Sequence, residues 1–428
     1  MPDLTPQLLP QLEAHRLPGL DLPAGLIHPK YDGGSILNLP STITTLFGAP
    51  APGTAEPLSP GYLEPLQDLA HGADRVVMVL MDALALHRLR DWIAQGKVPL
   101  WERLAESGFL APLTSVVPST TSTALPTIWS GLSPAEHGLV GYELWLKEYG
   151  VVANMITHAP FRVPGRLDQA GFNPEKVLPG PTLGRQLALE GVRTFAFQHY
   201  TIAHSGMSLM FFKDSQVSVF GGAAELMTNL RDLIEAEPRE KRFFGVYWSG
   251  VDSLSHTYGP DDERPALDFF HFTAALEQFL IDRLSPDGRG RTLLMLVADH
   301  GQIHTPKDPY YYLNSHPGLA RRLPILPTGE NRLIYFYVRP GQMEAVREYL
   351  EKTFSGRFAQ LEPGYAVENG LFGPGDPHPR LRDRIGDLVA IPLADAFLWW
   401  GEGESPIYGR HGGMTAQEML VPFLAARL

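Results

Sequence analysis

The stretch RTLLMLVADHG (291–301) is a nearly continuous apolar run that ends in Asp299 and His300. Apolar runs of this kind are typical of strands that are buried on both faces of a sheet. RVVMVLMD (75–82) and RFFGVYWSGVD (242–252) have the same form, and each also ends in an aspartate. The three stretches therefore predict neighbouring core strands of one sheet.

Helical patterns alternate with these strands along the chain. They lie at residues 99–108, 122–131, 183–191, 222–237 and 265–284, and several end in glycine. Strands that alternate with helices form parallel sheets covered on both faces. We expect an α/β fold with a doubly wound, mostly parallel sheet sandwiched by helices, and with a small α+β cap insertion.

The character of the sequence changes twice along the chain. Residues 1–72 are rich in Pro, Gly and Leu, which predicts an irregular N-terminal lead packed on the core. Residues 73–302 and 401–428 carry the strand–helix pattern of the core. Residues 303–400 combine two short periodic stretches with a Pro/Gly-rich loop, and we expect them to form the cap.

Composition narrows the class of protein. The net charge of −12 argues against binding duplex nucleic acid, and no apolar run is long enough to predict a membrane span. The N-terminus does not read as a signal peptide, so we expect a cytoplasmic protein. There is no cysteine, so any transition metal must be held by histidine and carboxylate, which suits zinc or manganese in a catalytic site.

Asp82, Asp252 and Asp299 each follow a predicted core strand. In open α/β sheets, ligands bind beyond the carboxyl ends of the strands, so the three acids should meet at one place. A single aspartate in such a position more often caps the next helix. Three of them, two with a neighbouring histidine, favour a metal site.

Histidines adjoin two of these acids. His256 lies four residues after Asp252, on the same face of a helical turn, and His300 directly follows Asp299. His411 lies in the glycine-rich stretch GRHGGMT and, taken alone, would be an ordinary loop histidine. Six carboxylate and imidazole positions are enough to bind two divalent metals, with zinc expected and manganese as the alternative.

A turn rich in hydroxyl groups precedes a predicted helix in VVPSTTSTALPTIWSGLSPAEHG (116–138). A hydroxyl on a metal at a helix N-terminus could act as a nucleophile toward an anionic substrate. Such a turn is also a frequent helix cap. Without the segments that carry the acids and histidines, we would interpret it as a cap.

The order of these segments resembles the alkaline phosphatase superfamily, nearest to the type I phosphodiesterase / nucleotide pyrophosphatase family. The resemblance spans roughly 75–301 and 405–428 and leaves the lead and the cap uncovered. It implies one metal on Asp252, His256 and His411, and a second metal on Asp82, Asp299 and His300 with Thr121 as the nucleophile bound to it. The family pattern P-[ST]-x-T selects Thr121 over its neighbours Thr120 and Ser122.

The chain departs from the family pattern at two places. The family's threonine is usually followed by F-P-N, whereas Ser122, Thr123 and Ala124 stand here. The family asparagine that binds a phosphoryl oxygen is replaced by Tyr142, whose hydroxyl could donate the same hydrogen bond. These departures leave the metal chemistry intact and put the substrate in question.

The resemblance implies a two-metal hydrolase that cleaves a phosphodiester or a nucleotide pyrophosphate through a phosphothreonine. Its substrate would be a small phosphate ester or nucleotide, and the oligomeric state stays open. The alternatives are a phosphomonoesterase, a phosphonate hydrolase, a cofactor-independent phosphoglycerate mutase and a non-catalytic metal-stabilised binding protein. A sulfatase is disfavoured because no C/S-x-P-x-R motif lies near Thr121.

Charge near the expected nucleophile favours diesters. No Arg or Lys lies between Ser115 and Tyr142, and two divalent metals would be balanced by three aspartates and an ionised threonine. The sum of these formal charges is near zero, which suits a diester monoanion better than a monoester dianion. Arginines 380, 382, 384 and 410 are expected to be solvated loop charges.

Overall fold

Two seven-stranded sheets, each with its own helices, make up the computed structural model, which describes residues 3–53, 55–162, 165–237 and 240–428. The first sheet has the order β2 (Phe109–Thr114), β16 (Leu420–Arg427), β9 (Thr292–Val297), β1 (Arg75–Met81), β8 (Arg242–Trp248), β6 (Arg193–His199) and β7 (Gln216–Phe220). All neighbours are parallel except β16, which runs antiparallel to both β2 and β9. The predicted doubly wound, mostly parallel sheet is confirmed.

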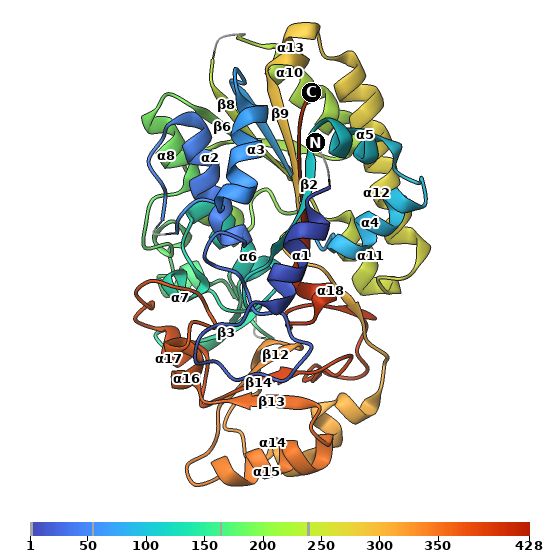
Figure 1. Cartoon of the computed structure of the whole chain (residues 1–428). Helices are drawn as coiled ribbons and strands as arrows, with labels where there is room; N and C mark the ends of the chain where they lie inside the picture. The colour runs from blue at the N-terminus through green and yellow to red at the C-terminus, as the bar shows by residue number, and fades with distance from the viewer. Residues whose placement is uncertain (1–2, 54, 163–164, 238–239) are drawn as a thin grey trace.

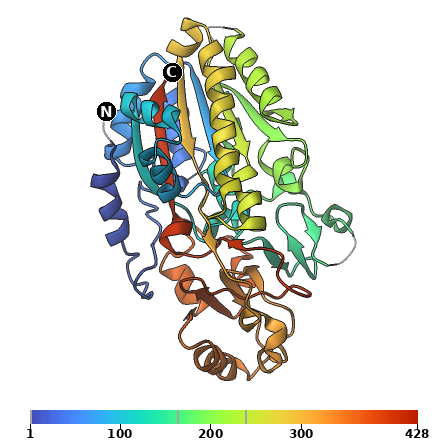
Figure 2. The ribbon, with the colours of Figure 1, turned by 90° about the vertical axis from the view of Figure 1, so that its right-hand side faces the viewer.

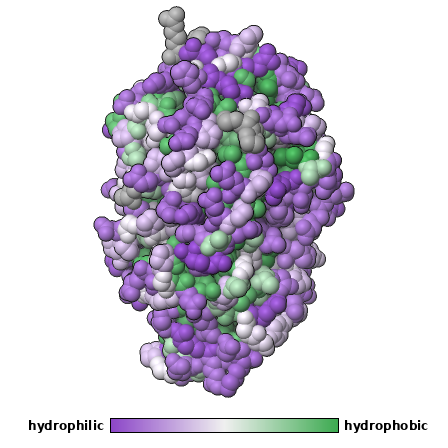
Figure 3. Space-filling view, viewed as in Figure 1, coloured by the Kyte–Doolittle hydropathy of each residue, from purple (hydrophilic) through white to green (hydrophobic). Residues whose placement is uncertain are grey.

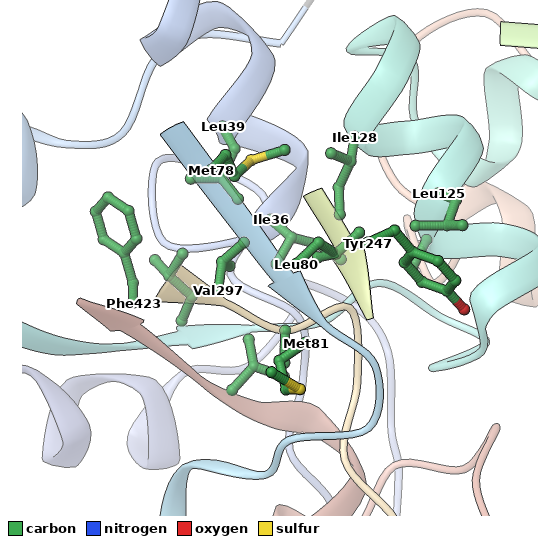
Figure 4. Close-up of a cluster of buried hydrophobic side chains, with 14 of the residues drawn as sticks. Ile36, Leu39, Met78, Leu80, Met81, Leu125, Ile128, Tyr247, Val297 and Phe423 are labelled. Carbon is green, nitrogen blue, oxygen red and sulfur yellow. The ribbon is translucent and has the colours of Figure 1, made fainter. Parts of the chain in front are cut away.

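The central strand β1 is buried along its whole length, as its apolar run predicts. Side chains alternate across a strand, so Met78 and Leu80 share one face of the sheet. Figure 4 shows them packed with Ile128 of α6 (Thr121–Ser130) and with Ile36 from the N-terminal part of the chain. The hydrophobic core therefore holds in place the strand that ends at Asp82.

Helices cover both faces of the first sheet (Figures 1 and 2). One face carries α2 (Leu39–Phe47), α3 (Pro60–Ala70), α6 and α8 (Leu183–Leu189), and the other carries α4 (Leu86–Ala94), α5 (Pro99–Ser107), α10 (Ala223–Glu235), α11 (Gly250–Tyr258) and α12 (Glu263–Ala275). Short helices complete the chain: α7 (Pro134–His137), α9 (Gly206–Phe211), α13 (Pro286–Gly290), α14 (Pro317–Ala320), α16 (Pro363–Glu368) and α17 (Leu381–Arg384).

Helix α6 is seated on the sheet by one close contact. A β-carbon at Gly245 of β8 would lie 2.5 Å from the ring of Trp129, so only glycine leaves room for this indole. Trp129 also stacks on Phe211, with ring centroids 6.0 Å apart, and meets Phe212 edge-on. This packing fixes α6, and with it the position of Thr121 at the helix N-terminus.

The second sheet lies at the carboxyl end of the central strands (lower half of Figure 1). Its order is β13 (Phe358–Leu361), β14 (Leu388–Pro392), β12 (Leu333–Phe336), β11 (Thr328–Glu330), β3 (Glu143–Leu146), β4 (Val151–Asn154) and β5 (Ala159–Pro160). All pairs are antiparallel, and α15 (Met343–Phe354) packs beneath the sheet.

The division of the chain into lead, core and cap stays a prediction. The second sheet includes β3–β5, which that division places in the core.

A buried ion pair joins the second sheet to the C-terminal segment. Arg332, in the turn between β11 and β12, donates from Nε and Nη2 to the two carboxylate oxygens of Glu418, at 3.0 and 2.8 Å. Glu418 lies in α18 (Ala416–Met419) and also accepts hydrogen bonds from the backbone N–H groups of Gly413 and Thr415. The pair thereby ties the second sheet to the loop that carries His411.

The N-terminal segment packs against the edge of the first sheet. The N–H of Leu4 donates to the carbonyl of Leu110 in β2 at 2.8 Å, and α1 (Thr5–Ala14) continues along this edge. The face of the molecule in Figure 3 is mostly hydrophilic, with small apolar areas scattered over it. Among the described residues, no helix is both long and apolar enough to cross a bilayer.

Candidate active site and metal centre

The ends of β1 and β9 are tied together at the site. Asp82 follows β1 directly, and the next residue, Ala83, has a left-handed backbone with φ of 59°. The Ala83 N–H donates to Oδ1 of Asp299 at 3.2 Å, and the N–H of His300 donates to the same oxygen at 3.0 Å. The two acids predicted from strand ends therefore lie side by side, both buried.

The hydroxyl turn and the C-terminal loop meet beside these acids. Ser119 pairs with Gly412 as an isolated antiparallel bridge, and its hydroxyl donates to the carbonyl of Gly413 at 2.7 Å. This contact places Thr121, the first residue of α6, close to His411 although the two are far apart in sequence. The structure thus explains why the order of these segments along the chain could predict one site.

Asp252, His256 and His411 form a first group of potential ligands. The Nε2 atoms of the two histidines are 3.2 Å apart. Oδ1 of Asp252 lies 3.3 Å from Nε2 of His256 and 3.7 Å from Nε2 of His411. The three potential ligand atoms therefore lie close to one another.

Thr121, His300, Asp82 and Asp299 form a second group. The Thr121 hydroxyl oxygen lies 3.1 Å from Nε2 of His300 and 3.5 Å from Oδ1 of Asp82. Nε2 of His300 is 3.5 Å from Oδ1 of Asp82 and 3.6 Å from Oδ2 of Asp299. Asp252 also lies within 4.8 Å of Asp82 and His300, so it is in reach of both groups.

These separations suit metal ligands. A tetrahedral ion with bonds of roughly 2.0–2.1 Å holds its ligand atoms about 3.3 Å apart. The seven separations given above lie between 3.1 and 3.7 Å. In addition, the buried Oδ2 of Asp299 has no hydrogen-bond partner in the described part of the chain. Both groups could therefore hold a divalent cation.

Electrostatics of the site favour a bound cation. Burial, together with the charges of Asp299 and Asp252, raises the pKa of Asp82 well above its ordinary value. Burial also raises the pKa of Asp299. Burial and the neighbouring rings of His300 and His256 lower the pKa of His411 well below its ordinary value, which keeps this imidazole neutral. Crowded buried acids beside a neutral histidine are the donor set that a divalent metal requires.

Backbone carbonyls orient two of the imidazoles. Nδ1 of His256 lies 2.8 Å from the carbonyl of Gly409, and Nδ1 of His300 lies 2.9 Å from the carbonyl of Gly301. A carbonyl only accepts, so each Nδ1 carries the proton and each Nε2 keeps its lone pair. This is the usual arrangement of a metal-bound histidine.

Tyr247 and Gln302 support the acids, and sequence reasoning did not identify either of them. The hydroxyl of Tyr247 in β8 donates to Oδ2 of Asp82, while Nε2 of Gln302 donates to Oδ1 of Asp252 at 2.8 Å. A tyrosine inside an apolar strand reads as core, so no local signal marked Tyr247. Gln302 follows the ADHG stretch, and that adjacency was the one available hint.

The site opens into a cavity of about 520 Å³. Thr121 and the three residues of the first ligand group line one side of the cavity. Thr120 and Tyr142 also line it, so the predicted substrate-binding residue lies beside the predicted nucleophile. The hydroxyl of Thr120 donates to Oε1 of Glu330 at 2.7 Å, and the backbone N–H of Tyr142 donates to the same oxygen at 2.9 Å. The Thr120 hydroxyl is thus engaged outside the metal groups.

Two of the arginines expected to be solvated are buried instead. Arg410 donates to the hydroxyls of Thr305 and Ser405, and its guanidinium lies 3.9 Å from the ring centroid of Phe397. Arg384 donates to the carbonyl of Gly138 at 2.8 Å. The expectation of solvated charge was wrong for both, because local sequence does not show that loops fold over these side chains. Neither lines the cavity beside Thr121.

The fold is that of the alkaline phosphatase superfamily of hydrolases. Residues 76–414 match the type I phosphodiesterase / nucleotide pyrophosphatase family. The chain belongs to this family.

Solved structures agree with this fold. Murine ectonucleotide pyrophosphatase / phosphodiesterase 5 superposes with a TM-score of 0.61 at 15% identity, over 82% of this chain and 87% of the other. Phosphonoacetate hydrolase from Sinorhizobium meliloti, in complex with phosphonoformate, superposes with a TM-score of 0.59 at 19% identity, over 82% and 89% of the two chains. No curated protein matches the chain in sequence.

Proposed function

We propose that the chain is a two-metal phosphodiesterase that cleaves small phosphodiesters or nucleotide pyrophosphates through a phosphothreonine at Thr121. The observation that carries the proposal is the position of the Thr121 hydroxyl, 3.1 Å from Nε2 of His300 and 3.5 Å from Oδ1 of Asp82, at the mouth of the cavity. The murine neighbour in complex with AMP is a variant with threonine replaced by alanine, described as inactive. That description supports a threonine nucleophile here.

Asp252, His256 and His411 would hold one cation, and Asp82, Asp299, His300 and Thr121 the other. Bound divalent cations, zinc or manganese, would lower the pKa of the Thr121 hydroxyl and neutralise charge on the phosphoryl oxygens. Because Thr121 is the first residue of a ten-residue helix, the backbone N–H groups of the first turn of α6 also favour an anion there.

The reaction would proceed in two displacements. The Thr121 oxygen attacks phosphorus in line, and the bond from phosphorus to the leaving oxygen breaks. This step gives a phosphothreonine that still carries the second ester group of the substrate, and it releases an alcohol or a phosphate that takes up the threonine proton. Water then attacks phosphorus from the vacated side and releases Thr121. Tyr142, whose hydroxyl replaces the family's asparagine, would hold a phosphoryl oxygen during both steps.

The test is hydrolysis by metal-loaded protein of known metal content. We expect protein dialysed against zinc to bind two ions per chain and to release p-nitrophenol from bis-p-nitrophenyl phosphate. Chelation should remove both the metal and the activity, and zinc should restore them. Phosphonoacetate and nucleotide pyrophosphates, tested in parallel, would place the substrate within the superfamily. Zinc-loaded protein with two ions and no turnover of any ester would overturn the proposal in favour of a metal-stabilised binding protein.

A further inference from the structure

The cavity beside Thr121 is lined by polar groups in addition to the potential metal ligands. Two carboxylates line it, Glu143 at the start of β3 and Glu330 at the end of β11. Over the described ranges of the chain, neither carboxylate makes an ion pair with Lys, Arg or His. An anionic phosphoester therefore enters a cavity that also carries unpaired acids.

Hydrogen bonds hold both carboxylates in place. Glu330 uses one oxygen, Oε1, to accept from Thr120 and from the N–H of Tyr142, and Oε2 of Glu143 accepts from the indole N–H of Trp400 at 2.8 Å. Burial raises the pKa of Glu330 to about 8 and that of Glu143 to about 7. A buried acid of this kind is stabilised in its charged form when a cation binds beside it.

The remaining wall is aromatic. Phe161, Trp399 and Trp400 line the cavity together with Tyr142. Trp399 lies directly over the backbone at Gly401, where a β-carbon would come within 1.9 Å of the ring, and its N–H donates to the carbonyl of Gly403 at 3.1 Å. Aromatic faces combined with carboxylates attract organic cations, and above all weakly hydrated ammonium groups.

One positive side chain lies near this wall. Arg162 donates to the carbonyl of Trp400 at 2.7 Å, packs over the ring of Phe161 and lowers the pKa of Glu143 through its charge. Glu330, the carboxylate nearer to Thr121, receives no such compensation. Glu330 is therefore the carboxylate that lacks a nearby cation, and a cationic ligand would stabilise its ionised form.

We propose that this cavity binds an alkylammonium group of the substrate, so that the enzyme acts on phosphoesters of amino alcohols. The proposal rests on the proposed function, since Thr121 must be the group that meets phosphorus. Glu330 accepts a hydrogen bond from Thr120, the residue before Thr121. An ammonium group two carbons from the ester oxygen would therefore lie between the Glu330 carboxylate and the aromatic rings. Glu330 is then a specificity-determining residue of the site.

Two esters with the same leaving group test the proposal. One is p-nitrophenyl phosphocholine, and the other is p-nitrophenyl 3,3-dimethylbutyl phosphate, in which a neutral carbon replaces the quaternary nitrogen. The shapes match and only the charge differs. We expect kcat/KM to be about tenfold or more higher for the cationic ester, in line with a desolvated cation–π contact supported by a carboxylate.

Glu330→Gln is the decisive variant, because the amide oxygen can still accept from Thr120 and Tyr142 while the charge is lost. The ratio of kcat/KM for the two esters should fall to within about threefold, and Glu143→Gln should lower it less. Glu344→Gln, at an exposed position of α15, removes the same charge elsewhere and should leave the ratio unchanged. Unfolding midpoints of the three variants should match the parent.

A binding measurement separates this inference from the proposed reaction. Calorimetric titration of zinc-loaded Thr121→Ala with phosphocholine and with 3,3-dimethylbutyl phosphate reports cation preference without turnover. Equal hydrolysis of the two esters, or a preference that survives Glu330→Gln, would overturn the inference and leave the proposed function standing. Tighter binding of phosphocholine without hydrolysis of either ester would uphold the inference and overturn the proposed function. Equal binding without hydrolysis would overturn both.

Discussion

The strand-end edge of the first sheet and the inner wall of the second sheet face the same cavity but are built differently. The first supplies short acids and imidazoles at separations of 3.1–3.7 Å, with no room between them for more than an ion. The second supplies large aromatic rings and two carboxylates around about 520 Å³ of space. In the proposed function, the first region carries out the reaction and the second region selects the substrate.

This contrast between the two regions predicts that substitutions in them have different effects on the kinetics. Changes at the strand ends should lower kcat for every substrate, because they act on groups that meet phosphorus or hold the groups that do. Changes on the wall of the second sheet should alter the ranking of substrates, because they act on parts of the ester that do not react.

Thr121→Ala should lower kcat by at least roughly 10³-fold with all esters, which corresponds to about 4 kcal/mol of activation free energy. The fold and the zinc content should change little, since the side chain is small and other ligands remain. Thr120→Ala is the matched control and should be milder, because its hydroxyl contacts Glu330. If Thr120→Ala is the inactive variant, the nucleophile is misassigned by one residue.

Arg332→Met should destabilise the protein by roughly 3–5 kcal/mol, because it leaves Glu418 buried without its cation. Burial opposes ionisation of Glu418, but Arg332 and the hydrogen bonds outweigh burial and lower its pKa. A pKa lower in the folded than in the unfolded state stabilises the fold above the ordinary value of 4.5, and this contribution is lost as pH falls through the folded pKa.

Denaturant unfolding measures this loss. The double variant Arg332→Met, Glu418→Gln should recover part of the stability, since no buried charge is then left alone. A loss below about 1 kcal/mol in the single variant would show that the pair does not tie the two sheets together.

Tyr247→Phe should lower zinc affinity or kcat by roughly 10–100-fold, the usual cost of removing a hydrogen bond to a metal ligand. The tyrosine hydroxyl holds Oδ2 of Asp82, which turns Oδ1 toward Thr121 and His300. Tyr62→Phe removes a similar buried hydrogen bond, to the carbonyl of Pro112 at 3.0 Å, and serves as control. Unchanged metal binding and turnover would mean that Asp82 needs no such support.

Zinc-loaded enzyme should prefer diesters, with a kcat/KM for bis-p-nitrophenyl phosphate about tenfold above that for p-nitrophenyl phosphate. Among the residues that the structure describes, no arginine lines the cavity, so these residues do not supply the extra positive charge that a monoester dianion requires. Rates at one pH and one zinc concentration decide this. A monoester preference of tenfold or more would move the protein to the phosphatase branch of the superfamily.

The sequence by itself determined the first sheet and the acids and histidines at its edge. Long apolar runs can be buried only in a central sheet, and parallel strands bring their carboxyl ends together, so Asp82, Asp252 and Asp299 had to meet. His411 and Thr121 followed from the order of motifs along the chain. The three aspartates were predictable because each follows a strongly patterned strand, whereas His411 lies in a glycine-rich loop and was identified only through the order of motifs.

Only the tertiary structure decided the part of the cavity wall that is formed by aromatic rings and by Glu143 and Glu330. The hydrogen bond between Thr120 and Glu330 spans 210 residues, and that between Trp400 and Glu143 spans 257. In sequence, Glu330 stands in a polar turn that reads as solvated, and Tyr247 reads as core. Whether an acid is exposed or buried against an active site depends on which distant segment packs over it, and no local periodicity carries that information.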